Sequence, residues 1–412
     1  MVQTQRERPA AVVVGDLNII RSLALGRVPV VLATSPANRT AFHSRHCAAA
    51  HLTPSPTQEP AAFVERLLEI GRTLADQRPV LFYNGDADLI AISNARERLA
   101  PYYRFLMPPR ELIDQLTDKQ SFAELARERG LPVPASIIYR AGGDPVEVLA
   151  GARYPCVVKP ASRVGWFTSL LVEYYGKPQK ALRVDDRAAL ERLLPLLDRS
   201  GGAFLVQQLI PGGEGQVLSY HSYVSRDGRL AGEYTGRKIR TYPLHYGISS
   251  CVEVTELPAV REAGRRILER LPCVGVAKMD FKRHPETGEL FLLEINPRFN
   301  LWNYPAAVAG VNLPLLAYLD ALGELPAGLA HIHRPVKWID GPAELGALRE
   351  ARRQGLGLGA WLASVHGTCV YQTWAWDDPW PTLWHAGWRA RRFLGRRWSR
   401  LWQGAVGLTV RR

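Results

Sequence analysis

The stretch between Val274 and Arg298 constrains the fold and the chemistry of this chain more than any other part. It reads VGVAKMDFKRHPETGELFLLEINPR, with two runs of alternating polar and apolar residues on either side of the segment HPETG. Proline and glycine in such a segment are typical of a tight turn. The pattern therefore predicts a β-hairpin.

Strand periodicity divides the side chains of this hairpin between two faces, because successive side chains point to opposite sides. On the second strand, Phe291, Leu293 and Ile295 share one face, where we expect them to be buried. The other face carries the polar side chains of both strands, namely Lys278, Asp280, Glu294, Asn296 and Arg298.

A register symmetric about Thr287 puts Asp280 directly across from Glu294. Facing carboxylates a few ångströms apart repel unless a cation lies between them. Oxygen ligands from Asp280, Glu294 and Asn296 suit a hard cation such as Mg²⁺, which commonly takes phosphate oxygens as its remaining ligands. The hairpin is therefore a candidate metal and phosphate site, and the alternative is an exposed hairpin with a solvated polar face.

Length and composition set the broad class. At 412 residues, 47% of them hydrophobic, the chain can form two or three domains with cores of their own. We expect neither a signal nor a transit peptide at the N-terminus, and no apolar run approaches the length of a membrane span. The five cysteines are scattered without C-x-x-C spacing, which indicates reduced thiols. These features predict a cytoplasmic protein.

The first part of the chain has the pattern of a parallel sheet. Gly15 ends its first apolar run, where a helix N-terminus could receive an anion. The sequence GDLN lacks GxGxxG spacing, so a dinucleotide site is only weakly supported, with Gly15 and Asn18 as its candidate contacts. The apolar runs cover residues 10–15, 28–33 and 79–83, and the intervening helices are expected from Asn18 to Gly26 and from Ala61 to Ala75.

The rest of the chain alternates helical and extended patterns. Thr117 is the expected cap of an amphipathic helix that Gly130 ends. Strands are expected at residues 154–160, which include Lys159, and at 204–210, and a hairpin at 221–226 and 230–234. A basic loop is expected from Thr235 to Arg240, and helices at 190–197, at 258–271 and within 305–322.

Several short motifs follow one another in a characteristic order. They are DKxxF with GLPVP, VVKP, VQQLIPGGE, MDF and LEINPR, all between residues 118 and 298. This order resembles the ATP-grasp superfamily, and the similarity covers at least residues 106–322. Within the superfamily, GRKIR and EINPRF look closest to the predicted ATP-dependent carboxylate–amine ligases related to peptidoglycan D-aspartate ligase.

The resemblance implies an α/β architecture, an ATP-grasp fold with three parts. Residues 1–115 would form a Rossmann-like pre-ATP-grasp domain. Residues 116–325 would form the ATP-grasp domain, with a lid lobe at about 130–207 and a larger catalytic lobe at about 208–325. Residues 326–412 would form a helical extension rich in tryptophan and arginine.

The resemblance also implies roles for the matching residues. Lys119 and Lys159 would neutralise ATP phosphates, and Glu214 would hold the ribose hydroxyls. Lys278 and Arg298 would stabilise charge on the transferring phosphoryl group and the acyl phosphate. The linker that contacts the adenine would consist of Gln207, Gln208, Leu209 and Ile210. The residues Asp280, Glu294 and Asn296 would hold one or two Mg²⁺ ions, with Mn²⁺ as an alternative.

The basic segment and the flap are less clearly matched. Arg237, Lys238 and Arg240 are candidates for clamping the substrate carboxylate or the γ-phosphate, and the alternative is a solvated basic loop. Many family members have a glycine-rich flap after the lysine of the K-P motif, but here Gly165 and Gly176 lie far apart. We expect a longer flap, in which Lys177 or Lys180 replaces some of the backbone donors.

The implied activity is transfer of the γ-phosphoryl group of ATP to a small-molecule carboxylate, followed by attack of an amine. A carboxylase-type enzyme that phosphorylates bicarbonate is the alternative, as is an inactive ATP-binding scaffold docked to a membrane. A soluble amino acid and a lipid-linked envelope precursor are equally compatible with the sequence as substrate. A homo-oligomer is also compatible with it.

The C-terminal tail has a composition of its own. Nine of the eleven tryptophans lie from Trp338 onward, and eight arginines but no acidic residue follow Asp378, which accounts for most of the net charge of +13. From Thr382 to Gln403, the spacing of tryptophan and leucine puts them on one face of a helix, and most of the arginines fall on the other face. This pattern is typical of a helix that lies in an anionic membrane interface. The alternatives are a helix packed on the body and, since no binding module is recognisable, less favourably a nucleic-acid contact.

Overall fold

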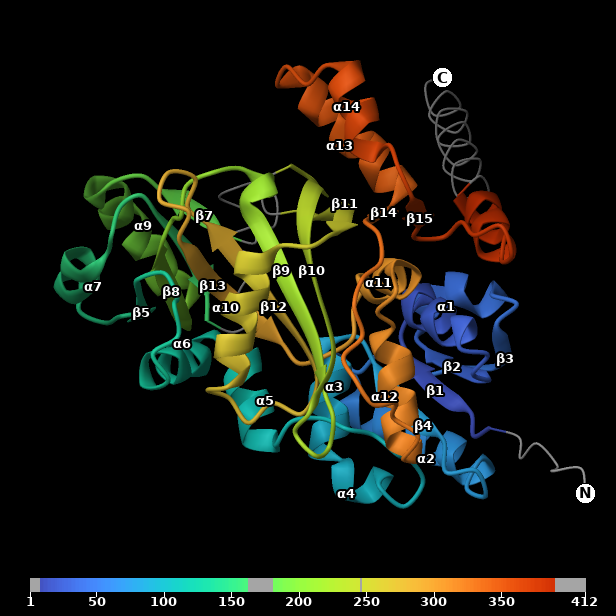
Figure 1. Ribbon diagram of the computed structural model, residues 1–412. Helices are drawn as coiled ribbons and strands as arrows, with labels where there is room; N and C mark the ends of the chain where they lie inside the picture. Colours follow the sequence, from blue (N-terminus) through green and yellow to red (C-terminus); the bar gives the residue numbers. More distant parts are fainter. Residues whose placement is uncertain (1–7, 162–180, 245–246, 390–412) are drawn as a thin grey trace, which may run out of the picture.

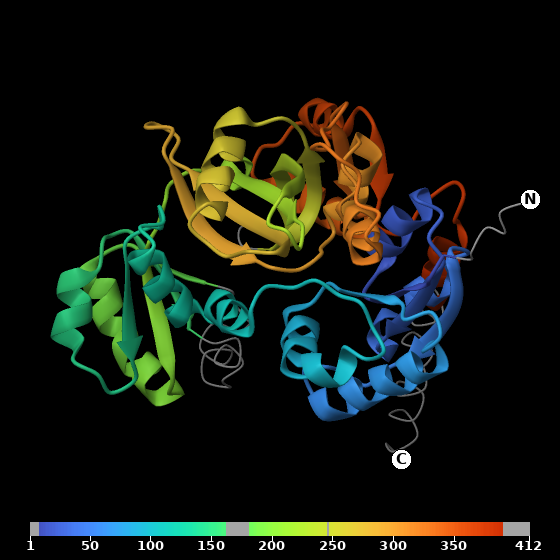
Figure 2. The ribbon, with the colours of Figure 1, turned by 60° about the horizontal axis from the view of Figure 1, so that its bottom comes forward.

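The computed structural model describes residues 8–161, 181–244 and 247–389. The expected flap, with Gly165, Gly176, Lys177 and Lys180, lies outside these residues, and so does the tail beyond Arg389. Three sheets form the framework, and in Figures 1 and 2 the seven-stranded sheet lies between the N-terminal sheet (blue) and the second four-stranded sheet (green).

The N-terminal part is a four-stranded parallel sheet in the order β3-β2-β1-β4, as the alternating apolar and helical segments predicted. The strand β3, whose alternation is obscured by three consecutive alanines, was not predicted, and neither were several of the helical segments given below. The strands are β1 Ala11–Val14, β2 Val30–Thr34, β3 Cys47–Leu52 and β4 Val80–Tyr83. The helices are α1 Leu17–Leu25, the 3₁₀ helix η1 Pro36–His43, α2 Pro60–Thr73, α3 Asp86–Asn94, α4 Arg96–Leu99 and α5 Arg110–Thr117.

A small lobe follows, built on an antiparallel sheet in the order β5-β8-β6-β7. Its first helix is capped by Asp118, whose carboxylate accepts the backbone N–H of Ser121, and not by Thr117 as predicted. The strands are β5 Ser136–Arg140, β6 Cys156–Pro160, β7 Leu182–Val184 and β8 Ala203–Gln208, and the helices are α6 Lys119–Glu128, α7 Pro145–Gly151 and α9 Arg187–Ser200.

The large lobe is a seven-stranded sheet in the order β13-β12-β9-β10-β11-β14-β15. Its strands are β9 Val217–Val224, β10 Leu230–Tyr242, β11 Ile248–Val254, β12 Gly275–Arg283, β13 Leu290–Asn296, β14 Val336–Ile339 and β15 Cys369–Tyr371. The helical segments are η3 Glu214–Gln216, α10 Pro258–Leu268, α11 Asn303–Ala309, α12 Leu313–Leu322, α13 Gly341–Arg353 and α14 Leu358–Val365.

Two features of this sheet differ from the sequence prediction. The expected basic loop from Thr235 to Arg240 is part of β10, because its main chain pairs with both β9 and β11. The sheet also continues past residue 325, since β14 pairs with β11 and β15 pairs with β14. The C-terminal region is therefore joined to the large lobe through main-chain hydrogen bonds.

Each face of the large sheet packs into its own core. On one face, Met279 and Phe281 of β12 pack with α5, α6 and α10. On the other face, Tyr234 and Trp302 pack with α11, α12 and the N-terminal sheet, which can be followed in Figure 1. Val276, Lys278 and Asp280 alternate with the buried residues of the first core, so they belong to the second face.

A β-bulge corrects the prediction for the apolar face of the hairpin. Asp280 pairs with Glu294 while its neighbour Phe281 pairs with Leu292, so Leu293 is the extra residue. A bulge of one residue reverses the alternation beyond it. As a result Leu292 is fully buried together with Ile295, whereas Phe291 and Leu293 are only partly buried.

Candidate active site

The polar face of the β12–β13 hairpin has the predicted register. Asp280 pairs with Glu294, and Lys278 pairs with Asn296. Paired residues on neighbouring antiparallel strands present their side chains on the same face, close together. The bulge lies on the turn side of these pairs, so the register assumed from the sequence holds at the site itself.

Asp280 is buried, with 3% of its surface exposed. Its Oδ2 atom lies 2.6 Å from Nζ of Lys278 and 3.8 Å from Nζ of Lys238, and its Oδ1 atom accepts a hydrogen bond from the hydroxyl of Ser219. Burial alone would raise the pKa of this carboxyl, but the two lysines and the hydrogen bonds hold the pKa well below its usual value. Asp280 is therefore ionised.

Glu294 is the electrostatic centre of the wider cluster. Its side chain is exposed, and its Oε1 atom accepts a hydrogen bond of 3.0 Å from the amide of Asn296. Burial lowers the pKa of Lys119 and of Lys159, and the negative charge of Glu294 counteracts that shift in both. The carboxylate of Glu294 thus lies within electrostatic reach of Lys119 and Lys159, the two lysines predicted to bind phosphate.

The two small-lobe lysines are held by local contacts. Nζ of Lys159, on β6, donates to Oε1 of Gln207 on β8 over 3.1 Å, and the amide of Gln207 donates to Ser136 over 3.1 Å. Nζ of Lys119, the first residue of α6, donates to the carbonyl of Pro160 over 2.7 Å. Lys119 and Lys159 are thus brought together from positions 40 residues apart.

The predicted adenine-reading linker is only partly available. The backbone N–H of Gln208 donates to the carbonyl of Ala135 and that of Leu209 to the carbonyl of Pro155. Ile210 is buried. A nucleotide base could accept a hydrogen bond from the N–H of Gln208 or of Leu209 only if the existing bond of that group were broken.

Lys238 and Glu214 complete the cluster on the large-lobe side. Burial would lower the pKa of Lys238, but the carboxylates of Asp280, Glu294 and Glu214 together raise it above its usual value. Glu214 lies at the start of η3 and also acts on Lys282. The structure therefore places the predicted ribose-binding carboxylate on the same side of the cluster as Lys238.

Arg298 has hydrogen-bond partners that the sequence did not predict. Its Nε atom donates to the carboxylate of Asp86, and its two terminal nitrogens donate to the carbonyl of Asn84 and to Oδ1 of Asn296, each over 3.2 Å. Asn84 and Asp86 follow strand β4, at the carboxyl edge of the parallel sheet. The polar motif NGDAD, which directly follows a buried strand, could have indicated in the sequence that these residues contribute to a site. The N-terminal sheet thus orients Arg298 toward the hairpin.

Two predicted arginines point elsewhere, which corrects their assignment. Arg240 is buried and forms an ion pair of 2.5 Å with Glu344 of α13. Arg237 forms a pair of 2.7 Å with Glu253 on the neighbouring strand. The physical reason is that β10 is an extended strand in a sheet, so its side chains reach adjacent strands and helices and do not hang in a loop.

Asn18 is also a packing residue and not a ligand contact. It is almost fully buried, its amide donates to Gln372 over 3.1 Å, and Nε1 of Trp338 donates to its Oδ1 over 2.9 Å. It therefore joins α1 to the C-terminal strands. Gly15 lies beside Asn84, since a Cβ atom on Gly15 would meet the Asn84 side chain at 3.3 Å.

The donor set of the hairpin suits a hard cation. Asp280, Glu294 and Asn296 offer carboxylate and amide oxygens, which are the ligands that Mg²⁺ takes in proteins. Within residues 8–161, 181–244 and 247–389, no group of three His, Cys, Asp or Glu side chains gathers as a metal site. An ion held here would take oxygens from Asp280, Glu294 and Asn296 and would fill its remaining positions with water or phosphate oxygens.

Comparisons with known proteins show what the whole chain resembles. No family model matches the chain. It is 26% identical over 276 residues to D-aspartate ligase of Enterococcus faecium (strain Aus0004), and the match spans 64% of each protein, less than two thirds of that enzyme. It is also 26% identical over 189 residues to D-alanine–D-alanine ligase of Ruminiclostridium cellulolyticum, covering 42% of this chain and 46% of that one.

Solved structures share the fold. The ADP complex of N5-carboxyaminoimidazole ribonucleotide synthetase superposes with a TM-score of 0.60 at 15% identity, covering 84% of this chain and 85% of that one. The chain therefore has the ATP-grasp fold, and the relatives that it resembles in sequence are the ligases named above.

Proposed function

We propose that this protein is an ATP-dependent carboxylate–amine ligase that forms an amide or peptide bond and releases ADP and phosphate. The observation that supports this most is the meeting of cations from both lobes around a pair of facing carboxylates. Those cations are Lys119 and Lys159 from the small lobe and Lys238, Lys278 and Arg298 from the large lobe.

In the proposed reaction, a carboxylate oxygen of the substrate attacks the γ-phosphorus of ATP, and the bond to the β-phosphate oxygen breaks to release ADP. An amine nitrogen then attacks the acyl phosphate carbon, loses a proton, and expels inorganic phosphate with the electron pair of the C–O bond. No covalent enzyme nucleophile is required. The protein contributes positioning and charge neutralisation.

The residues divide this work between the lobes. Lys119 and Lys159 would neutralise the phosphates, and Lys278 and Arg298 would stabilise charge as the phosphoryl group moves. Asp280, Glu294 and Asn296 would hold Mg²⁺, which when bound neutralises charge on the β- and γ-phosphates. Because Lys278 and Lys238 already hold Asp280 ionised, its carboxylate is ready to act as a metal ligand.

One substrate is proposed to be an amino acid, because the relatives matched by sequence carry the names D-aspartate ligase and D-alanine–D-alanine ligase. A carboxylase-type reaction on bicarbonate is the second candidate. It is favoured by the structural likeness to the biotin carboxylase domain of a 2-oxoglutarate carboxylase crystallised with MgADP and bicarbonate, with a TM-score of 0.60 at 14% identity.

The test is an ADP-release screen across pairs of amino acids and amines, with and without added bicarbonate. A ligase requires an amine, whereas a carboxylase requires bicarbonate. Glu294→Gln should lower turnover by a factor of about 100 or more, since it removes one of the two charged metal ligands. Because Glu294 is exposed, the variant should fold normally, which circular dichroism checks. Turnover equal to that of the wild type would refute the metal assignment.

We also propose that the C-terminal region attaches reversibly to an anionic membrane surface. Within the described part of the tail, Trp376 and Trp380 are 88% and 61% exposed, so most of the surface of these two rings faces solvent. The segment is anchored by Asp378, which is fully buried in an ion pair with Arg21. The arginines that follow Arg389 in the sequence supply the matching charge.

Vesicle sedimentation tests this attachment. Vesicles with anionic lipid should sediment the full chain but neither a chain truncated near Pro381 nor the double variant Trp376→Ser, Trp380→Ser; zwitterionic vesicles are the control. Equal sedimentation of all three proteins would remove the proposal. Among the described residues no single helix could cross a membrane; α11 and α12 have the necessary length and composition only together, and they meet at an 88° bend.

A further inference from the structure

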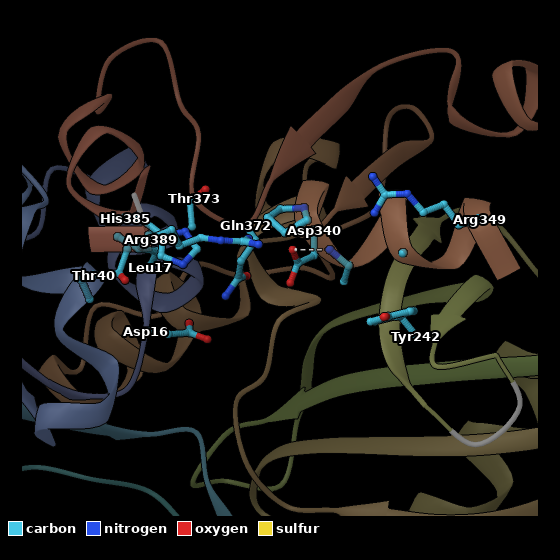
Figure 3. Close-up of a pocket in the computed structure, with 14 residues that line it drawn as sticks. Asp16, Leu17, Thr40, Tyr242, Asp340, Arg349, Gln372, Thr373, His385 and Arg389 are labelled. Atoms are coloured by element: carbon cyan, nitrogen blue, oxygen red, sulfur yellow. Dashed lines mark hydrogen bonds between the residues drawn. The ribbon is translucent and has the colours of Figure 1, made fainter. Parts of the chain in front are cut away.

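A pocket of about 530 Å³ lies where the N-terminal sheet meets the C-terminal region (Figure 3). One wall is the start of α1 and η1, and the other is the start of α13 with the chain that follows β15. Tyr242, at the end of β10, lies at the edge. The polar residues that line it are Asp16, Thr40, Tyr242, Asp340, Arg349, Gln372, Thr373, His385 and Arg389.

Two acidic and two basic side chains line this pocket, and only the acidic pair has hydrogen-bond partners among the described residues. Asp16 and Asp340 cap helices α1 and α13, where they accept the backbone N–H groups of Asn18 and Ala343. Arg349 and Arg389 form no hydrogen bond or ion pair with any residue in the part of the chain that the structure describes. Figure 3 shows the two arginines reaching into the pocket from opposite sides. A planar guanidinium is suited to a carboxylate or a phosphate.

The pocket is connected to the candidate active site along two lines of residues. Strand β10 runs from Lys238, beside Asp280, to Tyr242, and four residues of strand span about 13 Å. At the carboxyl edge of the parallel sheet, Asp16 follows Gly15, which lies beside Asn84, and the carbonyl of Asn84 binds Arg298. A molecule that reacts beside Arg298 could therefore extend into the pocket.

We propose that this pocket binds a distal anionic group, a carboxylate or a phosphate, of the second, amine-bearing substrate. The inference rests on the proposed ligase function for the identity of that substrate. It selects amines that carry a distal anionic group over amines as small as ammonia. Arg349 and Arg389 belong to the region after residue 325, which would thereby determine specificity.

The experiment uses the full chain and two probes, inorganic phosphate and glutarate, titrated by calorimetry in the presence of ADP and Mg²⁺. The double variant Arg349→Gln, Arg389→Gln should bind the preferred probe at least about tenfold more weakly than the wild type. Arg352→Gln, an exposed arginine on the same helix outside the pocket, is the matched control and should bind like the wild type. The probe that binds more tightly identifies the group.

In the ADP-release assay, the double variant should raise KM for an amine with a distal acid at least about tenfold, leaving KM for ATP unchanged. Equal probe affinity in the wild type and the double variant, or no binding of either probe to the wild type, would overturn the pocket assignment. A failure of the ligase proposal looks different, because ADP release would then be absent with every substrate pair while the probe titrations still report on the arginines.

Discussion

Lys278→Met should destabilise the folded protein by about 3 kcal/mol, because it deprives a buried carboxylate of its nearest cation. The side chains of Lys278 and Asp280 are 12% and 4% exposed, so water can replace little of the lost interaction. The same variant tests whether Asp280 can bind a divalent ion, since such an ion would replace the positive charge of Lys278.

The magnitude follows from two distances. Nζ of Lys278 lies 2.6 Å and Nζ of Lys238 lies 3.8 Å from Oδ2 of Asp280, which at an effective dielectric constant of about 20 corresponds to attractions of about 6 and about 4 kcal/mol. Desolvation of the carboxylate opposes both. Because Lys238 remains, we expect the lower end of the range of about 3–5 kcal/mol for a broken buried pair.

Thermal unfolding at pH 7 is the assay, and Tm should fall by about 6 °C at roughly 2 °C per kcal/mol. Arg283→Gln, an exposed cation on the same strand, is the control and should change stability by less than about 0.5 kcal/mol. The double variant Lys278→Met, Asp280→Asn should recover part of the loss, and millimolar Mg²⁺ should stabilise Lys278→Met more than the wild type. An unchanged Tm in Lys278→Met would refute the reasoning.

The pH dependence provides a second readout of the same pair. The folded-state pKa of Asp280 lies below its value in the unfolded chain, so the stability contributed by its charge is complete above that unfolded pKa. It is lost as the pH falls below about 4 toward the folded-state pKa. In Lys278→Met that pKa rises, so the difference in stability between the variant and the wild type should shrink on acidification. A constant difference from pH 7 to pH 3 would contradict this.

Three further outcomes are expected. Burial lowers the pKa of Lys159, so this lysine should lose its charge at a lower pH than an ordinary lysine does. As the pH rises, ADP affinity should therefore decrease before the usual titration range of lysine is reached. In fluorescence titrations, Lys159→Arg should move this decrease to higher pH. Glu344→Gln should lower the free energy of unfolding by about 3 kcal/mol in urea titrations, because it leaves Arg240 buried without its counter-ion, while the affinity for ADP stays unchanged. Asp86→Asn should lower kcat at least about tenfold with KM for ATP little changed, because it removes a charged partner that orients Arg298, and an unaltered kcat would show that Arg298 needs no such support.

The sequence alone determined the parts of this protein that depend on local pattern. The hairpin, the facing of Asp280 and Glu294 and the parallel N-terminal sheet all follow from alternation and turn residues within a few tens of positions. Side-chain direction in a strand repeats every two residues, so a short segment carries the information. The order of the ATP-grasp motifs added Lys119 and Lys159, which no local pattern could have joined to the hairpin.

The tertiary structure decided where each cation acts. Arg240 and Lys238 belong to the same basic segment, yet Arg240 is paired with Glu344, which lies 104 residues away, whereas Lys238 lies beside Asp280. Arg298 is held by Asp86, 212 residues away. A charged side chain takes the partner that reaches it in space, and its own segment carries no record of that partner. For the same reason the C-terminal strands, and the pocket they close against the N-terminal sheet, became visible only in the folded molecule.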